Sequence, residues 1–93
     1  MPMFFAALNR AAGNPPRPLV DQFLATYVLW REGCAEVEAA HARWRDAHRA
    51  ERGAACAAYR AALDREECAA RAHEDGMRRL RAAMASPGRK AVA

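Results

Sequence analysis

Mostly hydrophobic residues recur in alternating steps of three and four along two long stretches of the chain. The first stretch holds Val20, Phe23, Tyr27, Trp30, Cys34, Val37, His41, Trp44 and His48. The second holds Cys56, Tyr59, Leu63, Glu66, Ala70, His73, Met77, Leu80 and Met84. This is the spacing of the a and d positions of a heptad repeat, so each stretch predicts a helix that packs along one seam.

The two seams are out of phase by one residue, because eight residues separate His48 from Cys56. The intervening segment HRAERG ends in Gly53, and glycine is the usual residue at a left-handed helix terminus. We therefore predict an all-α fold, an antiparallel, coiled-coil-like helical hairpin over residues 19–85 with a turn near 48–54. The alternative is one continuous helix over 20–84, with the phase change as a skip.

A turn near Gly53 would set three pairs of residues against each other across the hairpin. These pairs are Trp44 with Leu63, Cys34 with His73, and His41 with Glu66. A turn half a heptad earlier would change all three pairs.

From Tyr27 onward, the position before each a residue is small. We call these positions the small-residue stripe: Thr26, Gly33, Ala40, Ala47, Ala55, Ala62, Ala69, Gly76 and Ala83. The chain has 25 alanines, but two glycines in the same phase are less expected, because glycine destabilises a helix. The stripe favours helices whose backbones approach closely.

The two ends of the chain differ from the hairpin. Residues 1–18 predict a short amphipathic helix followed by the proline-rich linker NPPRP, because proline cannot continue a helix. Residues 86–93, with Pro87 and Gly88, predict a disordered basic tail. The apolar run in MPMFFAALNR is too short for a signal peptide or a membrane span.

Three cysteines, Cys34, Cys56 and Cys68, form no CxxC pair and indicate neither a disulfide framework nor a zinc knuckle. They fit a reducing compartment, so we expect a cytoplasmic protein. No nucleotide-binding loop, hydrolase elbow or helix-turn-helix signature is present. These features favour a protein without enzymatic activity.

The first helix has more apolar surface than one seam can cover. The predicted interface residues are Phe4, Phe5, Leu24, Val28 and Leu29. Since a lone two-helix hairpin is a marginal fold at this size, we expect a homodimer that forms a four-helix bundle. Association with another helical protein would cover the same surface. The predicted function is a small helical protein–protein interaction or scaffold module.

Two other functions remain as alternatives. Glu38 and His41 form an ExxH motif, which resembles in outline the ligand pattern of ferritin-like di-iron bundles, and Glu66 would add a carboxylate for a transition metal. The structural alternative is a His41–Glu66 hydrogen bond that fixes the helix register. The second function is weak nucleic-acid binding through an unopposed basic patch after Gly76. The structural alternative is that these cations only stabilise the C-terminal end of the helix through its macrodipole. Its residues are Arg78, Arg79, Arg81, Arg89 and Lys90.

Overall fold

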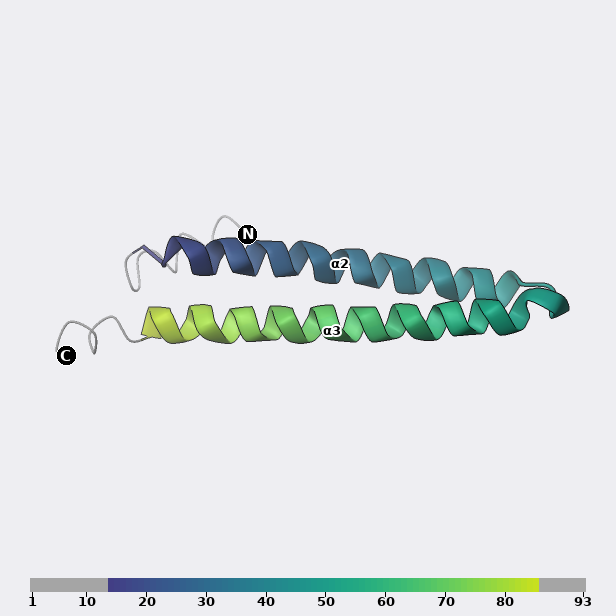
Figure 1. Cartoon of the computed structure of the whole chain (residues 1–93). Coiled ribbons are helices and arrows are strands. Elements are labelled where there is room, and N and C mark those ends of the chain that lie inside the picture. The colour runs from purple at the N-terminus through teal and green to yellow at the C-terminus, as the bar shows by residue number, and fades with distance from the viewer. Residues whose placement is uncertain (1–13, 86–93) are drawn as a thin grey trace.

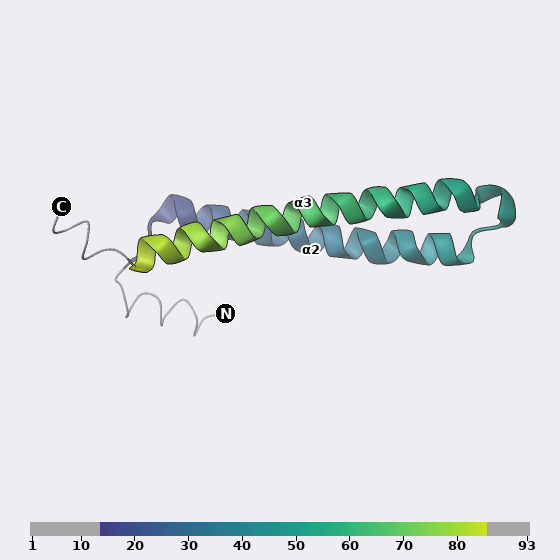
Figure 2. The ribbon, with the colours of Figure 1, turned by 90° about the horizontal axis from the view of Figure 1, so that it is seen from below.

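The computed structural model describes residues 14–85, and this part of the chain is all-α, with two long helices and no strand. Helix α2 spans Arg17–Asp46, the short 3-10 helix η1 spans Arg49–Glu51, and helix α3 spans Arg52–Ala85. The two long helices run antiparallel and side by side (Figures 1 and 2), which confirms the predicted hairpin. The predictions for residues 1–13 and for the tail over 86–93 lie outside the described residues.

Helix α2 begins inside the proline-rich segment, two residues earlier than predicted. Pro16 is the N-cap residue and Pro18 lies in the first turn. The amides of Leu19 and Val20 both donate to the carbonyl oxygen of Pro16, each at 3.1 Å. Proline is tolerated here because the amides of a first turn have no partner within the helix. The linker therefore ends before residue 17.

The chain reverses direction through two extended residues. Ala47 and His48 have φ, ψ angles of −70°, 143° and −72°, 160°, and η1 then leads directly into α3. This break excludes the continuous helix. Gly53 lies inside α3, so the prediction that it ends the first helix is wrong. The reversal lies at the start of the predicted range 48–54 and about half a heptad before Gly53.

The two helices meet mainly along the small-residue stripe. The residues of α2 and α3 that are buried are Phe23, Gly33, Ala40, Ala62, His73, Gly76 and Leu80. Four of these seven belong to the stripe, and the other three are d positions. The a positions lie to one side of the contact, and Tyr27 and Leu63 are each 38% exposed. The predicted a/d seam is therefore wrong by one position, because the helices pack through their d and g positions.

Backbone proximity explains this shift. A Cβ atom added at Gly33 would lie only 3.3 Å from the Cα atom of Glu66, in the opposite helix. A Cβ atom added at Gly76 would lie 3.6 Å from the hydroxyl oxygen of Thr26. The absence of large side chains at the stripe lets the backbones approach, so that d side chains fill the space beside it. This packing sets Gly33 against Glu66 and Thr26 against His73.

Candidate functional site

His73 is the buried polar residue of the described chain, with 6% of its surface exposed. It lies on α3 and its ring contacts three aromatic rings of α2. The ring centroids of Phe23, Tyr27 and Trp30 lie 5.0, 5.6 and 5.7 Å from that of His73, and the Trp30 ring is stacked on it at 14°. Aromatic packing of this kind adds to the free energy of burial. The cluster holds together the open half of the hairpin, which is the half away from the turn.

A hydrogen bond joins His73 to the small-residue stripe. The hydroxyl oxygen of Thr26 lies 3.0 Å from Nδ1 of His73 and 2.9 Å from the carbonyl oxygen of Gln22. A threonine hydroxyl has one proton. When it donates that proton to the carbonyl one turn back, its oxygen accepts from the Nδ1–H of His73. This pair fixes the helix register, a role that the sequence had assigned to His41.

Glu66 is held by a tryptophan from the other helix. The indole Nε1–H of Trp30 donates to Oε2 of Glu66 at 2.9 Å. The close approach of the Glu66 backbone to Gly33 places this carboxylate beside the indole. A charged acceptor makes this hydrogen bond stronger than a neutral one. The predicted pairing of Glu66 with His41 is therefore wrong.

A second aromatic cluster lies nearer the turn. The rings of Trp44 and Tyr59 are stacked with centroids 5.4 Å apart, and His41 lies 5.2 Å from Tyr59 and 6.2 Å from Trp44. Trp44 thus packs on Tyr59 and not on Leu63, as the earlier turn requires. His41 is exposed. His73 likewise packs on aromatic rings and not on Cys34, which is half-buried.

The three predicted metal ligands occupy different surroundings. Glu38 is exposed on α2, His41 lies against Tyr59, and Glu66 is bonded to Trp30. Within residues 14–85 no group of three or more His, Cys, Asp and Glu side chains is placed to hold a metal ion. Metal binding by these residues stays a prediction.

The predicted basic patch is partly neutralised within its own helix. Arg79 pairs with Asp75 at 2.9 Å, and Arg78 lies 3.6 Å from Asp75 and 4.0 Å from Glu74. These acidic residues lie one turn before the arginines, so the run after Gly76 is not unopposed. Arg81 is exposed, while Arg89 and Lys90 lie outside the described residues.

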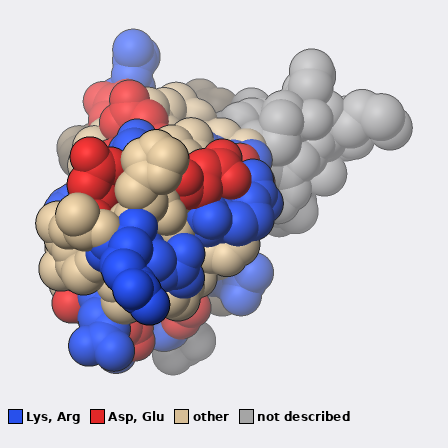
Figure 3. Space-filling model, turned by 90° about the vertical axis from the view of Figure 1, so that its right-hand side faces the viewer, with Lys and Arg blue, Asp and Glu red and all other residues tan. Residues whose placement is uncertain are grey.

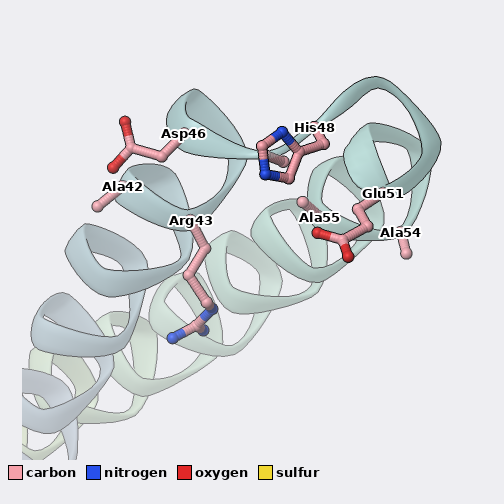
Figure 4. Close-up of a pocket in the computed structure, with 8 residues that line it drawn as sticks. Ala42, Arg43, Asp46, His48, Glu51, Ala54 and Ala55 are labelled. Carbon is pink, nitrogen blue, oxygen red and sulfur yellow. The ribbon is translucent and has the colours of Figure 1, made fainter.

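An open groove of about 620 Å³ lies at the turn. Its charged and polar lining residues are Arg43, Asp46, His48 and Glu51, and alanines form the rest. The four side chains do not converge on one point, and Asp46 and Glu51 lie on opposite sides of the groove (Figure 4). Seen from the turn end, basic side chains gather between acidic ones (Figure 3). This geometry offers no defined binding constellation.

The hairpin has two unlike flanks on either side of the helix contact. The polar flank carries an ion pair between the helices, Glu36 with Arg65 at 3.5 Å. Both are c positions, so the c positions of both helices lie on one flank. Successive residues of a helix are rotated by about 100° around its axis, so the a positions lie on the other side of the helix contact from the c positions. We call this the apolar flank, and its residues are Val20, Tyr27, Cys34, His41, Cys56, Leu63, Ala70, Met77 and Met84.

The predicted interface residues of α2 are exposed around more than one side of the helix. Leu24, Val28 and Leu29 are 43%, 53% and 58% exposed. Leu24 follows Val20 by one turn and borders the apolar flank, Val28 points outward, and Leu29 is a c position on the polar flank. Phe4 and Phe5 lie outside the described residues. The large exposed apolar side chains thus surround the open half of α2.

All three cysteines are free, and Cys68 is the exposed one, as its outward position in the repeat predicts. Within residues 14–85, neither α2 nor α3 has an apolar stretch long enough to cross a membrane.

Comparison with known proteins gives no match among protein-family models, curated proteins or solved structures.

Proposed function

We propose that this chain is a non-enzymatic helical interaction module that self-associates through exposed apolar side chains of its hairpin. One observation carries the proposal: the described hairpin exposes large apolar side chains and buries few. Its buried hydrophobic residues are Phe23, Ala40, Ala62 and Leu80, and two of these four are alanines. Such a core is small for a free-standing domain, because a lone two-helix hairpin buries little apolar surface.

The exposed side chains supply the missing burial when a partner covers them. Complete burial of a leucine or valine side chain contributes about 1.5–3 kcal/mol. Leu24 and Val28 are about half exposed, so covering each contributes about 1 kcal/mol per chain. With both chains contributing, and with Tyr27 and Leu63 added, the gross gain is several kcal/mol. This gain offsets the loss of rotational and translational freedom on association.

The test replaces two exposed apolar residues by charged ones without changing the helix contact. In the double variant Leu24→Glu and Val28→Glu, we expect the mass measured by light scattering to fall from dimer to monomer. Neither residue is buried in the hairpin, so the helical circular dichroism signal should remain largely intact. A charge-matched control is Ala61→Glu with Ala72→Glu, since both alanines are exposed on α3.

The control variant should keep the mass of the wild-type chain. If the Leu24 and Val28 variant keeps that mass as well, the proposal is refuted. A wild-type chain that is monomeric at high concentration also refutes it.

A further inference from the structure

We propose that the partner on the apolar flank is a second copy of this chain, with the two turns at the same end of a four-helix bundle. This inference rests on the proposed self-association and specifies its face and its orientation; Leu24 lies at the edge of this face, whereas Val28, which points outward, lies outside it. It would make the interface symmetric, with the same flank buried in both copies.

The composition of the two flanks selects the face. The a positions of α2 and α3 contain no Asp, Glu, Lys or Arg. The equivalent c positions of the polar flank include Glu36, Arg43, Arg65 and Arg79. A symmetric interface on the polar flank would bury these charges, which is costly unless every one is paired. The charged residues beside the apolar flank are at the outer e positions, such as Arg31 and Glu38 of α2, so the centre of this face can be covered without burying a charge.

The size of the apolar flank fits a second hairpin. Helix α3 has 34 residues and is about 51 Å long at 1.5 Å per residue. Two adjacent helices of about 10 Å diameter present a face of about 1,000 Å². A stable interface buries about 800 Å² on each partner. Overlap of the open halves alone would bury about half the face, so the two copies must overlap along most of their length.

The distribution of side chains along the flank selects the orientation. Its bulkiest apolar residues lie toward the open end, where Val20 and Tyr27 of α2 accompany Met77 and Met84 of α3. Toward the turn the flank carries His41, and arginines at positions 45, 49 and 52 lie at that end of the hairpin. A two-fold axis along the hairpin sets open end against open end. The opposite orientation would set each apolar end against the other copy's basic turn.

The chosen orientation also brings the arginines of the two turns near each other. Arg43, Arg45, Arg49 and Arg52 are all exposed, and Arg45 already lies 3.6 Å from Asp46. Repulsion between exposed charges is screened within about 8 Å at physiological ionic strength. The loss of apolar burial at the open ends is not screened by salt. Burial therefore determines the orientation, and the dimer should tighten as salt is added.

Pulsed electron paramagnetic resonance on singly labelled full-length chains tests the arrangement. Cys34→Ala, Cys56→Ala and Cys68→Ala remove the native thiols, and Ala50→Cys then carries a spin label at the turn. A second sample carries the label at Ala85→Cys, near the open end. Ala50 and Ala85 are both exposed, so neither label disturbs the helix contact.

We expect a short distance between copies, below about 35 Å or three helix diameters, for both labels. In the opposite orientation both distances would exceed about 50 Å, the length of α3. Overlap of the open halves alone would give a short distance at residue 85 and a long one at residue 50. Either pattern, from a sample that light scattering shows to be dimeric, overturns this arrangement and leaves self-association standing. A wild-type chain that light scattering shows to be monomeric overturns both proposals.

A substitution toward the turn end provides an independent test. Leu63 is an a position and 38% exposed, so full overlap of the flanks would bury it. Leu63→Glu should raise the dimer dissociation constant at least tenfold, whereas Ala61→Glu, two residues away and exposed, should change it less than threefold. Equal effects of the two variants would overturn the full overlap. Circular dichroism shows whether each variant remains helical.

Discussion

Alanine substitution of the glycines separates the close helix contact from ordinary helix propensity. Within a helix, Gly→Ala stabilises the fold by about 0.5–1 kcal/mol because alanine loses less backbone entropy. Gly53 has no atom within 4 Å of an added Cβ, so Gly53→Ala should give this full gain. Gly33 differs, because its added Cβ would lie 3.3 Å from a backbone atom of α3. Overpacking of this kind costs about 1–3 kcal/mol.

We therefore expect Gly33→Ala to destabilise the hairpin by about 0–2 kcal/mol, as the overpacking cost exceeds the propensity gain. The assay is urea unfolding followed by circular dichroism, at one protein concentration because association contributes to stability. The two variants should differ by about 1–3 kcal/mol, or about 4–24 °C in Tm for a domain of this size. If Gly33→Ala stabilises the chain as much as Gly53→Ala, the backbones do not approach as closely as described.

Three further substitutions test the candidate site. Thr26→Val removes the hydroxyl and leaves the buried Nδ1 of His73 without its partner, which should cost about 1–3 kcal/mol in urea unfolding. An unchanged midpoint would show that this bond does not fix the register. Trp30→Phe keeps the ring but removes the hydrogen bond to Glu66, and should cost about 1 kcal/mol in the same assay, whereas no loss would assign the stability to ring packing alone. If the predicted metal site exists, native mass spectrometry of protein purified without chelator should show bound metal that His41→Ala abolishes, and a metal-free wild-type spectrum would count against it.

The heptad pattern was sufficient to predict two antiparallel helices but not the face through which they meet. Tyr27 and His41 follow the hydrophobic period as well as Phe23 does, yet both are exposed. Periodicity alone does not distinguish a seam from a neighbouring column that packs beside it. The small-residue stripe carried the missing information, because Gly33 and Gly76 mark where the backbones approach.

The residue that ends the first helix was misassigned for a related reason. Gly53 is a plausible helix terminus by residue type, but Ala47 and His48 reverse the chain in extended conformations that most residues adopt. No residue preference marks that position in the sequence. Because the pairing centred on Gly53 was about half a heptad too late, His41 and not His73 was predicted to fix the helix register. Thr26 was the available clue, since it is the single polar member of the stripe, opposite His73.

The close contact at Gly33 has a consequence for how this sequence tolerates mutation. In an ordinary coiled coil, the large a and d residues are the most restricted positions, and the residues beside them vary freely. Here the restriction should be reversed along the stripe, where an added methyl group at Gly33 meets the backbone of Glu66. A saturation mutagenesis map of the helices should therefore show bands of intolerance every seven residues at small side chains. Bulky neighbours such as Tyr27 should be replaceable by other apolar residues.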